Sequence, residues 1–228
     1  LGEWFEIYNA SAETFDLRYL KVTDNGDNSF VVSESLTVAP DERLIFGRKG
    51  DVDTNGGVLV DYVYSNFLLS NADDEIRLVL NDVEVDVVAY DGGPLYPDPT
   101  GASMQLDPAS TGGDTNDVGG NWGTSKTPVA DIEGADMGTP GAANIPCHEV
   151  DCEDQLDDDA DGATDCDDGD CADLEGCGDD DNDGVYNRDE KCPGWDDAVD
   201  EDNDDIPDGC EIDWAGKAIP VSGSDWDI

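Results

Sequence analysis

Residues 75–90 read Glu-Ile-Arg-Leu-Val-Leu-Asn-Asp-Val-Glu-Val-Asp-Val-Val-Ala-Tyr, and this stretch decides the fold class of the first part of the chain. Two runs rich in Val, Ile and Leu, 75–80 and 83–90, are separated by the turn-forming pair Asn81-Asp82. Apolar runs of this length bounded by Asn, Asp, Gly or Pro are typical of β-strands. The stretch therefore predicts two strands separated by a turn.

Similar short segments recur on both sides of this stretch, and turn residues such as Asn55-Gly-Gly separate them. The other predicted strands are 3–9, 15–22, 30–38, 43–46, 58–64 and 102–106. Short strands with turn signals between them indicate an antiparallel sandwich or barrel. No stretch shows sustained helical periodicity, so we expect an all-β fold.

The composition divides the chain into two unlike parts. The 228 residues include 58 Asp or Glu and 10 Lys or Arg, for a formal net charge of −48. Residues 1–146 carry a net charge of −19 and residues 147–228 carry −29, and all seven cysteines lie in the second range. A Gly- and Pro-rich run, 138–146, interrupts regular structure between them. We expect a β-rich domain over 1–144, an Asp- and Cys-rich domain over 145–213, and a C-terminal tail over 214–228.

The charge excludes several classes of partner. Nucleic acid is not expected, because phosphate binding requires Lys and Arg, and an anionic membrane surface is disfavoured for the same reason. No apolar run approaches the roughly 20 residues of a transmembrane helix, so membrane insertion is not expected. His148 is the one histidine, and the chain contains no catalytic triad, P-loop or HExxH motif. We therefore expect that these residues do not form an enzyme.

Three twelve-residue segments of the second part, which begin at Asp157, Asp179 and Asp200, share one pattern. Oxygen-bearing side chains stand at positions 1, 3, 5, 9 and 12, and position 7 would offer a backbone carbonyl. A loop that winds around a small cation points alternate side chains inward, and Ca²⁺ accepts about 6–8 oxygen ligands. The pattern therefore predicts Ca²⁺ as the cofactor, against the alternative of a merely solvated acidic run. The predicted ligands are Asp157, Asp159, Asp161, Ala163, Asp165 and Asp168; Asp179, Asp181, Asp183, Val185, Asn187 and Glu190; and Asp200, Asp202, Asp204, Ile206, Asp208 and Glu211.

Position 6 of each loop requires a sharp turn. Gly162 and Gly184 occupy it in the first two loops, whereas Asp205 occupies it in the third. Asp tolerates a left-handed backbone less well than Gly. We therefore expect the third calcium site to be the weakest.

The clustered cysteines indicate disulfides, and hence an oxidising, extracellular compartment. The alternative is a metal-binding cluster, in which Cys147-His148 and Cys152 would form half of a zinc site. Seven is an odd number, so one cysteine pairs outside the chain, stays reduced or has lost its partner to truncation. The start at Leu1 without Met suggests a processed or excised fragment.

Four segments of the first part follow one another in a recognisable order. Glu3-Trp-Phe-Glu-Ile-Tyr-Asn comes first, then 16–22, then 36–46 with Ala39-Pro40, and Gly138-Thr-Pro-Gly-Ala-Ala-Asn closes the set. This ordered set resembles the lamin-tail domain found in secreted bacterial proteins. The resemblance implies an immunoglobulin-like antiparallel β-sandwich without a catalytic motif, of the kind that accompanies nucleases, proteases or surface repeats.

The acidic loops carry a second resemblance. Cys192-Pro193 follows the second loop, and Asp204-Asp-Ile-Pro-Asp-Gly-Cys ends the third, while Pro193 would stop the exiting helix of an EF-hand. These features resemble the thrombospondin type 3 repeat, and residues 151–171 also resemble a Cys/Asp-rich putative metal-binding motif of secreted bacterial proteins. The first resemblance implies a disulfide between the cysteines at 192 and 210. The other four, Cys152, Cys166, Cys171 and Cys177, are then expected to pair among themselves in one of three connectivities.

Two functions fit these expectations. The first is an extracellular, calcium-binding, non-catalytic binding and spacer protein, in which the β-sandwich is carried on a calcium-stabilised stalk. The alternative is the accessory region of a larger secreted hydrolase, a nuclease or protease, whose catalytic domain is absent from this chain. The second part has few apolar residues for its length, so its folding is expected to depend on calcium. The sequence does not identify a surface or protein partner for the sandwich.

Overall fold

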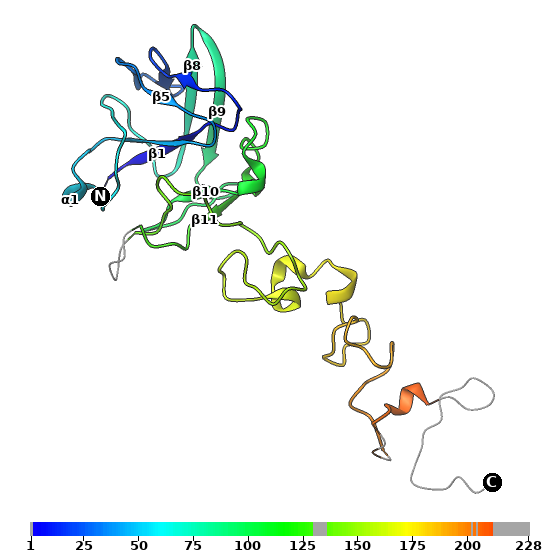
Figure 1. Ribbon diagram of the computed structural model, residues 1–228. Helices are drawn as coiled ribbons and strands as arrows, with labels where there is room; N and C mark the ends of the chain where they lie inside the picture. The colour runs from blue at the N-terminus through cyan, green and yellow to red at the C-terminus, as the bar shows by residue number, and fades with distance from the viewer. Residues whose placement is uncertain (1, 130–135, 202, 204, 212–228) are drawn as a thin grey trace, which may run out of the picture. The chain divides into compact units, whose positions relative to one another are not determined.

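The computed structural model describes residues 2–129, 136–201, 203 and 205–211 (Figure 1). It divides the chain into two compact units, Leu1–His148 and Glu149–Ile228. The C-terminal tail expected over 214–228 lies outside the described residues. Within the described residues, no helix is long and apolar enough to cross a membrane.

Short strands make up most of the regular structure of the first unit. They are β1 Trp4–Tyr8, β2 Phe15–Asp16, β3 Lys21–Thr23, β4 Ser29–Val31, β5 Thr37–Val38, β6 Arg43–Gly47, β7 Tyr62–Val63, β8 Asp73–Leu80, β9 Val83–Asp91, β10 Met104–Leu106 and β11 Trp122–Thr124. The helical segments in the described part of this unit are one turn each: α1 Val52–Asn55, η1 Pro108–Ser110 and η2 Gly119–Asn121. The all-β class is therefore confirmed, while the immunoglobulin-like sandwich stays a prediction.

The strands form four sheets. The largest has the order β4-β3-β8-β9 and is antiparallel throughout. A second sheet has the order β1-β6-β7, in which β6 pairs antiparallel with β1 but parallel with β7. The pairs β2-β5 and β10-β11 form two small antiparallel sheets.

The β8-β9 hairpin covers the stretch 75–90, with Asn81 and Asp82 as its turn. Its two turn residues, Asn81 and Asp82, have φ angles of +52° and +62°. Positive φ at both central residues matches the right-handed twist of the flanking strands, and Asn and Asp tolerate this conformation better than most residues. The two predicted strands therefore pair directly across the predicted turn.

Two predicted strands are divided in the structure. The segment 15–22 forms β2 and β3 instead of one strand, and 30–38 contributes to β4 and β5. The break in the first follows from Tyr19, whose φ of +71° turns the chain out of the strand. Asp16 supports the bend, since its Oδ1 atom accepts hydrogen bonds from the backbone N–H groups of Arg18 and Leu36.

A cluster of aromatic side chains fills the core of the first unit. The rings of Phe5 and Phe46 stack with centroids 5.2 Å apart, and those of Phe30 and Tyr64 stack at 4.9 Å. Buried aliphatic side chains surround them: Leu17, Leu20, Val22, Val32, Val38 and Leu44. Full burial of such a side chain stabilises a fold by about 1.5–3 kcal/mol, so this unit has an apolar core of its own.

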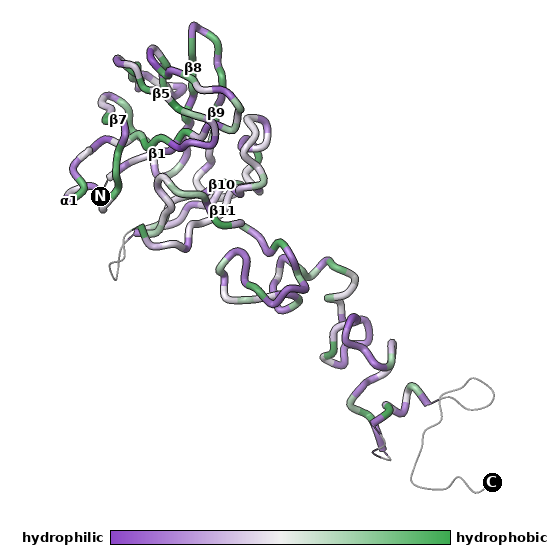
Figure 2. Tube along the Cα trace, viewed as in Figure 1, coloured by the Kyte–Doolittle hydropathy of each residue, from purple (hydrophilic) through white to green (hydrophobic). Residues whose placement is uncertain are grey.

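The second unit is organised differently. Its regular segments within the described residues are single 3₁₀ turns: η3 Asp165–Asp167, η4 Gly169–Cys171, η5 Glu175–Cys177 and η6 Asp208–Cys210. Figure 2 shows that hydrophilic residues dominate this part of the chain. Its core cluster consists of four cysteines with Tyr186 packed against them. Apolar burial therefore contributes much less here than in the first unit.

Candidate metal centres

The three acidic loops share two left-handed backbone positions among their described residues. Each has a left-handed residue at position 4 and another at position 6. The φ angles are +60°, +62° and +61° at Ala160, Asn182 and Asn203, and +98°, +93° and +73° at Gly162, Gly184 and Asp205. The repeat in sequence is therefore also a repeat in conformation.

The first carboxylate of each loop holds this turn together. Its Oδ2 atom accepts a hydrogen bond from the backbone N–H at position 6. The pairs are Gly162 to Asp157, Gly184 to Asp179 and Asp205 to Asp200, each at 3.0 Å. In the first two loops this bond closes the turn over positions 2 to 5, and the carboxylates at positions 1 and 5 lie close together.

The second loop brings three of its aspartates together. One carboxylate oxygen from each of Asp179, Asp181 and Asp183 lies within 4.8 Å of the others. Both oxygens of Asp181, and both oxygens of Glu190 at position 12, are shielded from solvent and have no hydrogen-bond partner within the described structure. Shielded polar atoms are nearly always satisfied in proteins, so these four oxygens indicate a ligand of opposite charge.

Glu190 is coupled electrostatically to the same aspartates. Loss of solvent is the largest cause that raises the pKa of Asp181, and the negative charge of Asp183 is the next largest. Loss of solvent also raises the pKa of Glu190, and the charges of Asp181 and Asp183 raise it further. The carboxylate at position 12 therefore interacts with those at positions 3 and 5, although ten consecutive residues separate the ends of the loop.

This arrangement suits a hard divalent cation. Two oxygens that bind one Ca²⁺ at about 2.3–2.6 Å are separated by at most about 5 Å, and the observed groups lie within 4.8 Å.

Asn187 at position 9 turns back across the loop, where its Oδ1 atom accepts a hydrogen bond from Asp180 N–H at 3.1 Å. Asp208 of the third loop does the same with Glu201 N–H at 3.0 Å.

The first loop brings together Asp157, Asp159 and Asp161, again within 4.8 Å of one another. Asp168 at position 12 is only 2% exposed, and its Oδ2 atom has no hydrogen-bond partner. Position 9 differs from the other loops. Asp165 has a φ of +50° and lies in a separate group with two other carboxylates.

The third loop is described only in part. Asp202 and Asp204, predicted at positions 3 and 5, lie outside the described residues. Asp200 and Asp208 have the hydrogen bonds already given, and the Oε2 atom of Glu211 is shielded from solvent. The backbone carbonyls predicted as ligands at position 7, those of Ala163, Val185 and Ile206, stay predictions.

Three disulfides frame the loops. Cys192 pairs with Cys210, as the resemblance to thrombospondin type 3 repeats implied. The structure also selects one of the three open connectivities, with Cys152 paired to Cys171 and Cys166 paired to Cys177. The zinc alternative fails, because a cysteine within a disulfide, such as Cys152, does not bind zinc as a thiolate.

Residues outside the predicted ligand set support the second loop. Asp197 N–H donates to Asp183 Oδ2 at 2.6 Å, while the Asp197 carboxylate accepts from the N–H groups of Lys191 and Cys192 at 3.0 Å. No regular spacing in the sequence points to Asp197, because it follows the loop by seven residues. Tyr186 and Arg188 connect the loop to the preceding repeat, through Asp167 Oδ1 and the Cys152 carbonyl, both at 2.8 Å.

Comparison of the chain with protein-family models, with curated proteins and with solved structures finds no match in any of the three.

Proposed function

We propose that this chain is an extracellular, calcium-binding, non-catalytic binding and spacer protein, in which the β-rich first unit is carried by a calcium-stabilised second unit. The observation that carries the proposal is the second loop. Its Asp181 and Glu190 carboxylates are shielded from solvent, lack hydrogen-bond donors and interact with the neighbouring aspartates. Such a group of negative charges is strongly unfavourable unless a cation neutralises it.

Calcium is the cation that fits best. The side chains offered are carboxylates and an amide, all of which bind through oxygen, and Ca²⁺ accepts many such ligands in flexible geometry. Mg²⁺ requires a near-octahedral shell and usually retains several waters, so a crowded protein loop suits it less well. Extracellular modules of this kind bind Ca²⁺ with dissociation constants of about 10⁻⁴–10⁻³ M.

The extracellular assignment has independent support. Three disulfides within a short segment are typical of secreted and surface proteins, because the cytosol keeps thiols reduced. The second unit also has little apolar core. Disulfides and bound ions would therefore replace hydrophobic burial as its main source of stability.

For the first unit, we infer an immunoglobulin-like sandwich of the lamin-tail kind. The support is the order of its elements: β1 lies in the opening Glu3–Asn9 segment, and β5 and β6 begin within the segment 36–46. A crystal structure in which the sheets pack face to face with immunoglobulin connectivity supports this assignment. A closed barrel overturns it.

The calcium proposal is tested by isothermal titration calorimetry of the full chain with CaCl₂ at millimolar concentration. We expect binding that Asp181→Asn reduces by one ion. Asp173→Asn is the matched control, because it removes one negative charge from an exposed residue between the loops. Absence of calcium binding to the wild-type chain, or equal losses in the two variants, contradicts the proposal.

A further inference from the structure

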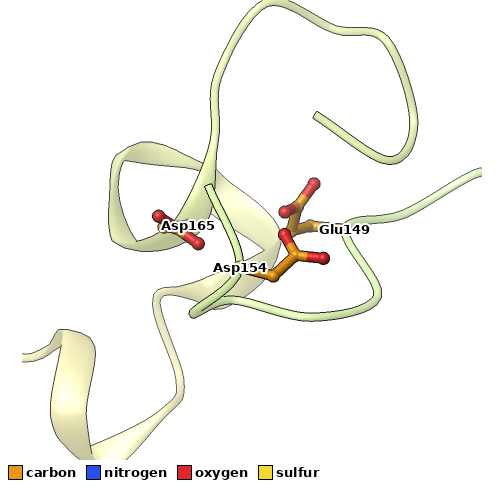
Figure 3. A group of neighbouring side chains, drawn as sticks. All are labelled: Glu149, Asp154 and Asp165. Carbon is orange, nitrogen blue, oxygen red and sulfur yellow. The ribbon is translucent and has the colours of Figure 1, made fainter. Parts of the chain in front are cut away.

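Three carboxylates of the second unit form a group that does not follow the spacing of the loops. One oxygen from each of Glu149, Asp154 and Asp165 lies within 4.8 Å of the others. The side chains come from different stretches of chain, with Asp165 on η3 (Figure 3). Oxygens separated by no more than about 5 Å can bind a single Ca²⁺, so the group has the dimensions of a one-ion site.

The backbone holds these carboxylates in place through one oxygen each. The donors are three N–H groups of the turn that follows Asp154. Asp158 donates to Glu149 Oε2 at 3.1 Å, Leu156 to Asp154 Oδ1 at 2.9 Å, and Gln155 to Asp165 Oδ1 at 3.1 Å. For Glu149 this leaves the second oxygen, Oε1, without a hydrogen-bond partner.

Burial of Glu149 is the independent sign of that ligand. Glu149 and Asp165 are each only 9% exposed, and the Oε1 atom of Glu149 has no hydrogen-bond partner. Within the described residues, no ion pair joins any of the three carboxylates to a basic side chain. A buried carboxylate oxygen without a donor or a counter-charge is costly, and a bound cation would remove that cost.

We propose that Glu149, Asp154 and Asp165 form a fourth cation site, separate from the three loop sites, with Ca²⁺ as its ion. The geometry of the three carboxylates supports a cation site by itself, whereas the choice of calcium rests on the proposed function. Asp165 then belongs to this site instead of the first loop, whose own ion is held by the group around Asp157. Asp154 is exposed, so water completes the coordination on that side.

The disulfides of the first repeat account for the position of this site. Cys166 follows Asp165 directly and is tied to Cys177, while Cys152, between Glu149 and Asp154, is tied to Cys171. The Cys152–Cys171 bond brings the segment before the loop against the residues that follow it, and the Cys166–Cys177 bond ties the end of the loop to the chain beyond. The corresponding positions after Asn187 and Asp208 are Arg188 and Gly209, so neither of the other loops has a cysteine there.

The test counts the Ca²⁺ ions bound to the full, disulfide-bonded chain by equilibrium dialysis with ⁴⁵Ca²⁺. Glu149→Gln and Asp154→Asn each remove one proposed ligand with little change in shape. We expect each variant to bind one ion fewer than the wild-type chain. Asp181→Asn should lose a different ion, so a double variant that combines Glu149→Gln with Asp181→Asn should bind two ions fewer than the wild-type chain.

Double variants decide where Asp165 belongs. If it shares an ion with Glu149, Asp165→Asn combined with Glu149→Gln loses one ion, whereas Asp165→Asn combined with Asp157→Asn loses two. The reverse result returns Asp165 to the first loop and overturns the proposal. Wild-type ion counts in both Glu149→Gln and Asp154→Asn also overturn it.

The same experiment separates failure of this site from failure of the proposed function. If Asp181→Asn loses an ion and the two variants of this site do not, only the fourth site is wrong. If the wild-type chain binds no Ca²⁺, both proposals fail. Disulfide mapping by mass spectrometry checks that Glu149→Gln retains the Cys152–Cys171 bond, and Asp154→Asn changes an exposed side chain, so a loss of fold in one variant leaves the other informative.

Discussion

Gly184→Ala isolates the contribution of the left-handed turn to calcium binding. Gly184 has a φ of +93°, and no heavy atom lies within 4 Å of a Cβ built at that position. The substitution therefore introduces backbone strain without a clash against a neighbouring group. The strain costs about 1–3 kcal/mol, and the stiffer alanine in the unordered loop offsets about 0.4–1 kcal/mol of it.

If calcium orders the loop, this net cost of about 1–2 kcal/mol appears in the affinity and weakens binding by about 5- to 30-fold. A CaCl₂ titration followed by ¹⁵N NMR resolves the sites. The Val185 amide reports the second loop, because it donates to Asp183 Oδ1 at 2.8 Å. The Ala163 amide reports the first loop in the same way, since it donates to Asp161 Oδ1 at 2.8 Å.

The matched control is Gly194→Ala. Gly194 has a φ of +86° and equally open surroundings, but it lies between the second and third loops. It should carry a similar strain and leave both titration midpoints unchanged. If Gly184→Ala shifts the Val185 midpoint by less than about twofold, the loop already holds this backbone without the ion, and calcium binding does not order the turn.

The converse change, Asp205→Gly, removes strain at a φ of +73° and should tighten the third site, measured in the same titration; an unchanged affinity would show that the turn does not limit that loop. Chelation with EDTA should expose the second unit to limited proteolysis while the first unit, which has its own apolar core, stays protected; equal protection with and without EDTA would mean that the disulfides suffice. The raised pKa values of Asp181 and Glu190 mean that the ion-free fold binds protons more tightly than the unfolded chain, so the stability they contribute is present at low pH and is lost as pH rises through those values. Proteolysis of the EDTA-treated chain should therefore accelerate toward neutral pH, whereas the calcium-loaded chain should show the opposite trend. Replacing Cys192 and Cys210 by Ser opens a closed loop with a sequence separation of 18 residues and should destabilise the third loop by about 3 kcal/mol, seen as new cleavage sites there; an unchanged cleavage map would show that the bond is dispensable.

Several elements of the first unit were predictable because their signals are local. The turn at Asn81-Asp82 and the apolar runs beside it lie within sixteen consecutive residues, and the structure pairs them directly. The division of 15–22 at Tyr19 was not predictable, because nothing about a tyrosine favours a positive φ. That conformation is maintained by contacts with the segment around Leu36, which is distant in sequence.

The sequence by itself determined the register of the acidic loops, since all oxygens of one loop fall within twelve consecutive residues and the turn between them depends on the residue at position 6. The tertiary structure alone decided the disulfide pairing of the first repeat and the grouping of Glu149, Asp154 and Asp165. Four cysteines at short spacings allow three connectivities, with loops that differ in length. Because loop-closure entropy depends only on the logarithm of loop length, chain entropy chooses only weakly among them. The folded structure pairs Cys152 with Cys171 and Cys166 with Cys177 inside one buried cluster, and it groups carboxylates that no periodic pattern in the sequence connects.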